Sequence, residues 1–428
     1  MGQAMSTLAG AATCMNAAMA TASAVATIVV AGRLGAAWGA LPNTAGIAGT
    51  GLGAVLLTRL MTRFGRRAGL LSGYAAATAG GAFAVLAVAH PGGGSARDTR
   101  EVAALCAGML LLGCGNAGAQ LSRYAAAELY PAPRRGFAIG AMVWAATVGA
   151  VGGPLLLQPS SDAATRLGVT GYAGPFAVAA AASAAAFTAV ALLPGRSVTR
   201  QAPGRKPDRT RPSLKNLAST RAARQALAVM VTGQVVMVGV MTAAPLAMHM
   251  NGQGLGAVGM TLSAHTAGMF ALSPLTGRLL DRYGARPVML GGLLTLMTST
   301  GLLAAGSGET LPRTVALFLL GYGWNLCFIG GSGRLAGGLE PEQRMHAEGA
   351  VDAGVWAAAA VASTSSTAAL SAGGYPMLAI AAGSLALLTM TFLLDTRDPE
   401  HPRPGEHPRP EEHPRPEEHP QRKAGAPG

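Results

Sequence analysis

Long apolar segments follow one another along almost the whole chain, and short polar or charged stretches separate them. Most of these segments are close to the roughly 20 residues that an α-helix needs to cross the hydrocarbon core of a bilayer. They are rich in Ala and Gly, which let helices pack closely in lipid. The pattern predicts twelve membrane-spanning helices, near residues 5–30, 38–58, 69–89, 102–124, 137–157, 173–194, 226–248, 256–276, 287–306, 312–333, 348–371 and 375–394.

One stretch interrupts this pattern, because residues 195–225 are polar, basic and contain prolines. Six predicted helices precede it and six follow. We therefore expect an N-terminal half at 1–194 and a C-terminal half at 226–395, joined by a cytoplasmic linker. The remaining residues, 396–428, repeat His-Pro-Arg-Pro and His-Pro around pairs of Glu. Proline-rich charged repeats stay extended, so we expect this tail to be disordered.

The composition also indicates a membrane protein. Only 12% of the 428 residues are charged, whereas a soluble domain carries about 25%. The formal net charge is +13, but the basic residues stand in short blocks between apolar segments, which argues against a nucleic-acid partner. The four cysteines lie inside apolar segments and form neither a disulfide nor a metal-binding pattern. There is no Walker loop for ATP, and we expect no metal and no cofactor.

The distribution of Lys and Arg predicts how the chain crosses the membrane. With the N-terminus inside, most of the 32 basic residues fall on the cytoplasmic side, among them Arg63, Arg123 and Arg334. The other side carries few, such as Arg33 and Arg166. Cytoplasmic loops of membrane proteins hold an excess of Lys and Arg. We therefore expect a multi-pass protein of the cell (inner) membrane with both termini in the cytoplasm.

The turn between the eighth and ninth predicted helices carries a distinctive string. It reads Gly277-Arg-Leu-Leu-Asp281-Arg282-Tyr-Gly284-Ala-Arg286. The glycines permit a tight turn. The acid and the flanking arginines form a charge cluster that can pair with neighbouring helix ends in one conformation and release them in another. The string resembles the loop signature of the major facilitator superfamily, G-x-L-x-D-R-x-G-x-[RK].

A second copy lies at the matching position of the first half, between the second and third predicted helices. It reads Thr58-Arg-Leu-Met-Thr62-Arg63-Phe-Gly65-Arg66-Arg. Thr58 and Thr62 replace the Gly and the Asp of the signature, so this half lacks the acid of the charge cluster. Two copies at equivalent places form an internal repeat, as the parallel halves of the superfamily imply.

Another repeat relates the fourth and fifth predicted helices to the tenth and eleventh. Leu-Leu-Gly113-Cys-Gly leads to Pro131-Ala-Pro-Arg and a Trp, and Leu-Leu-Gly321-Tyr-Gly leads to Pro341-Glu-Gln-Arg and a Trp. The resemblance to the superfamily thus covers nearly the whole chain except the linker and the tail. It implies an all-α membrane protein of two pseudo-symmetric six-helix bundles, which works as a monomer and transports small molecules by alternating access.

The fifth predicted helix carries Gly140, Gly149 and Gly153, followed by Pro154. The spacing resembles the first part of the antiporter signature of drug:proton exporters in the superfamily, whose final Gly-Gly is absent here. Such glycines let another backbone approach closely, and the proline bends the helix. Ordinary packing of small residues is the alternative explanation. The Arg that those exporters carry in the fourth helix has no counterpart in residues 102–122.

Ionisable side chains within the spans are candidates for proton coupling, because they are costly in lipid. Asp352 is the carboxylate placed deep in a span, and Glu348 lies at the entrance of the same helix. A buried carboxylate can take up and release a proton near neutral pH. The alternative is that Asp352 pairs with a loop arginine such as Arg66. His265 is either a protonatable or substrate-facing group or a packed neutral imidazole.

Uncharged polar residues in the spans are candidates for substrate binding. Asn116, Gln120, Gln234 and Asn325 either bind a substrate or form hydrogen bonds with neighbouring helices. We favour substrate binding for Asn116 and Asn325, because they occupy similar places in the fourth and tenth predicted helices. Trp324 offers a stacking face for a flat ligand.

These features predict proton-coupled export of a small, largely apolar molecule, such as an antibiotic or secondary metabolite. The alternative is proton-linked uptake of a vitamin-like solute, since His265-x-x-Gly-Met-Phe and Gly323-Trp-Asn resemble a bacterial subgroup that includes vitamin and flavin permeases. A receptor would need a soluble domain or a large external loop, and an enzyme would need a catalytic pair within the spans. The expected partners are the substrate, protons and the bilayer.

Overall fold

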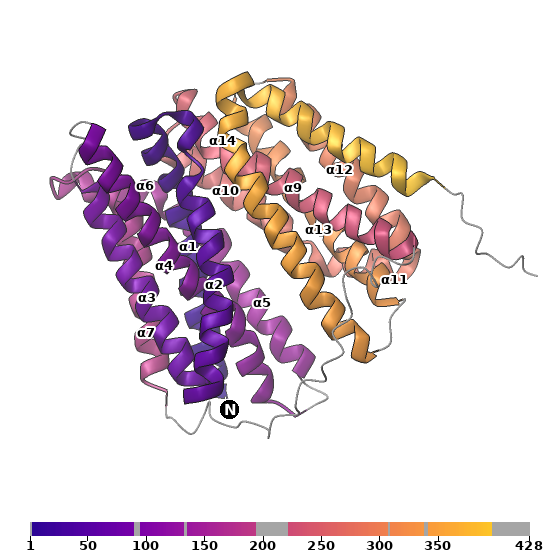
Figure 1. Ribbon diagram of the computed structural model, residues 1–428, viewed down its shortest axis with the longest axis horizontal. Coiled ribbons are helices and arrows are strands. Elements are labelled where there is room, and N and C mark those ends of the chain that lie inside the picture. The colour runs from indigo at the N-terminus through magenta and orange to yellow at the C-terminus, as the bar shows by residue number, and fades with distance from the viewer. Residues whose placement is uncertain are drawn as a thin grey trace, which may run out of the picture. The chain divides into compact units, whose positions relative to one another are not determined.

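The computed structural model describes residues 2–89, 95–131, 135–193, 221–306, 309–337 and 341–395, and every regular element in this part of the chain is a helix (Figure 1). The first half contains α1 (Gly2–Leu34), η1 (Ala36–Trp38), α2 (Leu41–Phe64), α3 (Arg66–Val88), α4 (Ser95–Glu128), α5 (Arg135–Gly152), η3 (Gly153–Leu156), α6 (Leu157–Arg166) and α7 (Ala173–Ala191). The second half contains α9 (Arg221–Met250), α10 (Leu255–Phe270), α11 (Ser273–Tyr283), α12 (Ala285–Ala304), α13 (Thr310–Gly337) and α14 (Pro341–Leu394). Most of the predicted linker and the predicted tail lie outside the described residues.

Eleven helical segments among the described residues are long and apolar enough to cross a membrane. The last of them, Gly354–Leu394, has 41 residues, about twice the roughly 20 that one crossing needs. Gly374 interrupts its helical backbone with φ 75° and ψ 173°, and Figure 1 shows α14 as an orange arm and a yellow arm. This segment accounts for the predicted helices 348–371 and 375–394. The predicted all-α membrane fold is confirmed.

Glycines bring helices together in the same way in both halves. A methyl group placed on Gly113 of α4 would collide with the backbone oxygen of Gly46 in α2. A methyl group on Gly321 of α13 would collide in the same manner with the backbone oxygen of His265 in α10. Small residues permit such close contact between helices in lipid. The internal repeat in the sequence therefore has a structural counterpart in these two crossings.

The spanning helices run in alternate directions and end on two sides of the bundle. The turns at Gly65 and Gly284 lie on one side, which we call the arginine-rich end; the connections from α1 to α2 and from α9 to α10 lie at the opposite end. Gly65 and Gly284 have φ values of 90° and 79°, a backbone conformation that favours glycine. The tight turns expected from the two loop signatures are thus present in both halves.

Hydrogen bonds join the two halves toward the opposite end. The amide nitrogen of Ala40, just before α2, donates to Oγ1 of Thr367 in α14 at 3.0 Å. Oγ of Ser263 in α10 donates to the carbonyl oxygen of Val151 in α5 at 2.7 Å. These contacts hold the halves together on the side away from the arginine-rich turns.

Candidate functional site

A cavity of about 510 Å³, which we call the central cavity, lies between the two halves. Residues of α1, α4 and α5 form one wall, and residues of α9, α10, α11, α13 and α14 form the other. Its volume falls within the roughly 300–1,000 Å³ of small-molecule sites. The residues that the sequence suggested for substrate binding all line it: Asn116, Gln120, Gln234, Trp324 and Asn325. The structure brings them together, and their role in binding stays a prediction.

Three aromatic rings form a continuous wall of the central cavity. The ring of Trp324 stacks on that of Phe328, with centroids 5.1 Å apart and an interplanar angle of 18°. Phe270 meets Trp324 edge-on at 6.0 Å. The indole Nε1 of Trp324 donates to Oε1 of Gln234 at 2.7 Å. These contacts fix the position of Trp324, so that the stacking face expected from the sequence is held in place before any ligand binds.

Asn325 uses its amide group to hold a helix break. Nδ2 of Asn325 donates to the carbonyl oxygen of Met269 at 2.7 Å and to Oγ of Ser273 at 2.8 Å. Its Oδ1 accepts from Oγ1 of Thr276 at 2.7 Å. These partners flank the interruption between α10 and α11, where the second helix begins at Ser273 and carries Pro274 in its first turn. Asn325 is only 3% exposed, so its geometry corresponds to the alternative of bonding between helices.

The amides on the first-half wall form fewer or longer hydrogen bonds with the rest of the protein. Nδ2 of Asn116 lies 3.4 Å from Oγ1 of Thr50, and Gln120 has no hydrogen-bond partner among the described residues. Asn16 of α1 also lines the cavity, although the sequence interpretation passed it over. The signal was present, because Asn16 is a polar residue in the middle of a long apolar segment.

Arg123 lines the central cavity, although the charge pattern assigned it to a cytoplasmic loop. That assignment is corrected by the length of α4, which continues to Glu128 and includes Arg123 in a half-buried position. Residues 102–122 carry no charge, but the fourth span does bring an arginine to the cavity. The run of Ala at 125–127 before Pro131 was the available signal, since Ala strongly favours helix.

The candidates for proton coupling occupy different surroundings. His265 is 3% exposed at the crossing of α10 and α13. Its Nδ1 donates to the carbonyl oxygen of Leu317 at 2.8 Å, and its Nε2 has no partner among the described residues. His265 is not among the residues that line the central cavity, which favours the packed-imidazole alternative. Asp352 and Glu348 belong to α14, but their side chains lie outside the described residues.

The last arginine of each loop signature binds the final helix of its own half. Arg67 donates to the carbonyl oxygens of Val190 and Ala191 at the end of α7. Arg286 donates to the carbonyl oxygen of Leu393 at the end of α14 at 3.2 Å. A cation is stabilising at a helix C-terminus, where carbonyl groups lack helical partners. The two turns are thus held by the same kind of contact between an arginine and a helix C-terminus, although their signatures differ.

Asp281, the acid that the second loop signature has and the first lacks, is exposed. Asp281 forms neither an ion pair nor a hydrogen bond with any described residue. Thr62, at the matching position, donates only to the carbonyl oxygen of Arg59 at 2.8 Å. The guanidinium groups of Arg63 and Arg282 both lie over the next aromatic ring, 5.2 and 5.3 Å from the centroids. A partner for Asp281 at a neighbouring helix end therefore stays a prediction for another conformation.

Two of the glycines in the antiporter-like helix lie at close helix contacts. Methyl groups on Gly149 and Gly153 would collide with backbone atoms of α1, whereas Gly140 has open space around it. The backbone oxygen of Pro154 approaches Gly259 of α10 just as closely. These contacts account for Gly149, Gly153 and Pro154 by packing between helices, which is the alternative to a specific antiporter role.

A larger cavity of about 960 Å³, which we call the end cavity, lies at the opposite end. Gln158 of α6 lines it and bridges the halves, since its Oε1 accepts from the amide of Gly256 at 3.1 Å. Nε2 of Gln158 donates to Asp162 at 2.7 Å. Tyr172 and His249 meet edge-on across the same cavity with ring centroids 6.4 Å apart. Among the described residues, no group of His, Cys, Asp and Glu could hold a metal ion.

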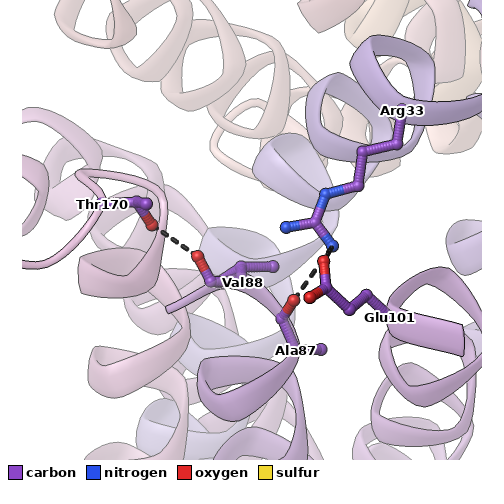
Figure 2. A network of polar contacts seen from close by, with 5 residues as sticks. All are labelled: Arg33, Ala87, Val88, Glu101 and Thr170. Carbon is purple, nitrogen blue, oxygen red and sulfur yellow. Dashed lines mark hydrogen bonds and ion pairs between the residues drawn. The ribbon is translucent and has the colours of Figure 1, made fainter. Parts of the chain in front are cut away.

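A polar cluster beside the end cavity ties the first half together (Figure 2). Nη1 of Arg33 in α1 lies 2.5 Å from Oε2 of Glu101 in α4 and donates to the carbonyl oxygen of Ala87 in α3 at 3.0 Å. Oγ1 of Thr170 donates to the carbonyl oxygen of Val88. The side chains of Arg33 and Glu101 are 11% and 15% exposed, so this ion pair is largely buried.

Comparison with known proteins agrees with this architecture. The family model described as Major Facilitator Superfamily matches residues 7–258 and 247–424. The uncharacterised MFS-type transporter YdeG of Bacillus subtilis (strain 168) is 30% identical over 373 residues, which cover 84% of either chain. The riboflavin transporter RfnT of Brucella anthropi is 28% identical over 304 residues, covering 71% of this chain and 73% of that one.

Solved structures share the fold. The partially occluded, inward-open xylose transporter XylE from E. coli superposes with a TM-score of 0.65 at 14% identity and covers 92% of this chain and 99% of its own. A POT family transporter in complex with 5-aminolevulinic acid gives a TM-score of 0.68 at 11% identity, covering 91% of this chain and 95% of its own. At these identities the likeness concerns the fold alone.

Proposed function

The chain belongs to the Major Facilitator Superfamily, a family of multi-pass membrane transporters and not of enzymes, and we propose that it exports a small, flat, largely apolar molecule in exchange for protons. The aromatic wall of the central cavity carries this proposal. Phe270, Trp324 and Phe328 present ring surfaces to a space that residues of both halves enclose. Three methionines among the lining residues add adaptable apolar surface.

The contacts between the halves support alternating access. Hydrogen bonds such as Ser263 to Val151 join the halves toward the opposite end, and the central cavity lies between the middle of the helices and the arginine-rich end, where Arg123 lines it. By the charge bias of the loops, the arginine-rich end faces the cytoplasm. This conformation then receives solute from the cytoplasm, and rocking of the halves around the cavity releases it outside.

Proteoliposomes with an imposed pH gradient test the proposal. Wild-type protein should concentrate a flat aromatic solute against its gradient and stop when an uncoupler collapses the pH difference. Asp352→Asn keeps one protonation state, so it should lose uphill transport and retain exchange of solute across the membrane. Glu309→Gln, a change at an exposed carboxylate before α13, is the matched control and should behave like wild type. Uphill transport by Asp352→Asn would place the coupling group elsewhere.

Uptake of a flavin-like solute is the second candidate. It is favoured by the relative named as a riboflavin transporter and by the stacked rings of Trp324 and Phe328, which suit a fused ring system. A riboflavin-requiring host separates the two directions. Growth at low external riboflavin, dependent on this protein, indicates uptake. Raised resistance to toxic aromatic compounds, abolished by an uncoupler, indicates export.

A further inference from the structure

Hydrogen bonds within the protein orient the amide on the second-half wall of the central cavity. Oε1 of Gln234 accepts the indole N–H of Trp324 at 2.7 Å, and the indole itself is held by Phe328 and Phe270. With its oxygen already accepting from the indole, Gln234 offers mainly its Nε2 group to a solute, and that nitrogen has no acceptor among the described residues. This wall therefore presents hydrogen-bond donors beside an aromatic surface.

On the first-half wall, where Gln120 and Arg123 also line the cavity, two amides offer the complementary group. Nδ2 of Asn16 donates to the carbonyl oxygen of Ala12 at 2.9 Å, and Nδ2 of Asn116 is directed at Oγ1 of Thr50 at 3.4 Å. In both amides the nitrogen has a partner, and Oδ1 has none among the described residues. Asn16 and Asn116 therefore offer carbonyl oxygens, which only accept hydrogen bonds.

We propose that the central cavity selects planar ring systems that carry both a carbonyl oxygen and a ring N–H, as lactam, imide and pyrimidinone rings do. The carbonyl oxygen of the solute accepts from Nε2 of Gln234. The ring N–H donates to Oδ1 of Asn16 or Asn116, and the ring packs against the wall that contains Trp324. This assignment rests on the transport function proposed above and names the class of solute for the same cavity.

A solute of this class connects the two halves of the transporter. Gln234 and Trp324 belong to the second half, whereas Asn16 and Asn116 belong to the first. A ring with only one of the two groups satisfies one wall and leaves an amide on the other without a partner. Loss of one neutral hydrogen bond weakens binding by about three- to tenfold. Selectivity thus follows from the complementary groups that Gln234 on one wall and Asn16 and Asn116 on the other present to the solute.

Three bicyclic ligands of similar size test the assignment on the full-length protein in lipid nanodiscs. 2-Quinolinone carries the carbonyl and the N–H, N-methyl-2-quinolinone keeps only the carbonyl, and naphthalene has neither. Equilibrium binding is measured with empty nanodiscs as the blank. 2-Quinolinone should have the highest affinity, the N-methyl compound should bind about three- to tenfold more weakly, and naphthalene should have the lowest affinity of the three. Equal affinities for 2-quinolinone and naphthalene would overturn the assignment.

Variants test whether the preference for the carbonyl and the N–H of the ligand comes from the two walls. Gln234→Met removes the donors and should weaken 2-quinolinone about three- to tenfold while naphthalene binds as before. Gln234→Glu keeps an acceptor for Trp324 and should show the same selective loss, so it serves if the Met variant does not fold. Asn16→Leu combined with Asn116→Leu should abolish the preference for N–H over N-methyl. Gln253→Met, at the end cavity, is the matched control and should leave the ranking unchanged.

Two outcomes separate this assignment from the transport proposal. Selective binding of 2-quinolinone without any movement across proteoliposome membranes contradicts the export function and upholds the ligand class. Transport of 2-quinolinone and naphthalene with equal affinity and rate upholds the export function and overturns the ligand class. A loss of affinity for all three ligands in folded Gln234→Met would assign Gln234 to packing and also overturn the proposal.

Discussion

The end cavity is the larger of the two cavities, at about 960 Å³ against about 510 Å³, yet most of its polar side chains are bound to other parts of the protein. Arg33 binds Glu101 and a backbone carbonyl, and Gln158 binds Asp162 and the backbone of the second half. In the central cavity, Gln120 has no partner among the described residues, and Gln234 has one of its two polar atoms engaged.

This difference shows that volume is a poor guide to a binding site in such a bundle. A side chain that already has its hydrogen bonds gains little from a ligand, because binding would break one bond to form another. The end cavity is therefore better explained as a seam that holds helices together. The central cavity combines unengaged amides with a fixed aromatic surface, which is the composition of a small-molecule site.

The largest expected effect on solute binding comes from Trp324→Ala in the central cavity. This change removes the stacking surface and releases Oε1 of Gln234, so solute affinity should fall by about tenfold or more. Equilibrium binding in nanodiscs measures it. Trp38→Ala, at a tryptophan of η1 that is 55% exposed, is the matched control and should bind solute normally. Similar losses in both variants would contradict the central cavity as the binding site.

The next effect is on stability and concerns the end cavity. Arg33→Met leaves Glu101 buried without its cation, which costs about 3–5 kcal/mol when a buried pair loses one partner. Thermal unfolding followed by intrinsic fluorescence should shift to a lower temperature, whereas solute affinity of the folded protein should stay within about twofold. Adding Glu101→Met should restore much of the stability, because no buried charge remains. A selective loss of solute affinity in Arg33→Met would make the end cavity a binding site after all.

A smaller effect is expected from Gln158→Ala, which removes the hydrogen bond to Gly256 between the halves. One such bond contributes about 1 kcal/mol, so the balance between open and closed forms of this end should shift by about fivefold. Distances between spin labels on α6 and α10 report that shift. The order of preference among solutes should not change. No shift in the label distances would mean that the seam does not depend on this bond.

The smallest effect is expected from Tyr172→Phe. The hydroxyl of Tyr172 lies 3.5 Å from Nε2 of His249, which is long for a hydrogen bond. Burial raises the pKa of Tyr172, so its hydroxyl stays protonated near neutral pH and the change removes no charge. Transport should remain within about twofold of wild type, with the same dependence on pH around neutrality. A large loss of transport would show that this ring pair closes the end cavity.

Much of the fold could be read from the sequence, because its causes are local. The length and apolarity of each segment predict a span, and the repeated strings at Gly65 and Gly284 predict two equivalent turns. The shared contact at these turns was not expected. Arg67 and Arg286 each bind the last carbonyl groups of a helix that ends more than a hundred residues later in the sequence. The residues of a loop signature do not reveal which helix end lies beside that loop in the fold.

The sequence by itself determined the all-helical membrane fold and the set of polar residues within the spans, and it predicted two related halves, since these depend on local composition and repeated motifs. Tertiary structure decided which of those residues face the cavity. Asn116 and Asn325 hold similar places along their helices, yet the partners of Asn325 are residues 49 to 56 positions earlier, at the break between α10 and α11. Arg123 reached the cavity because α4 extends past it. The hydrogen bonds open to a side chain depend on the rotation and register of the neighbouring helix, and a linear pattern of apolar residues specifies neither.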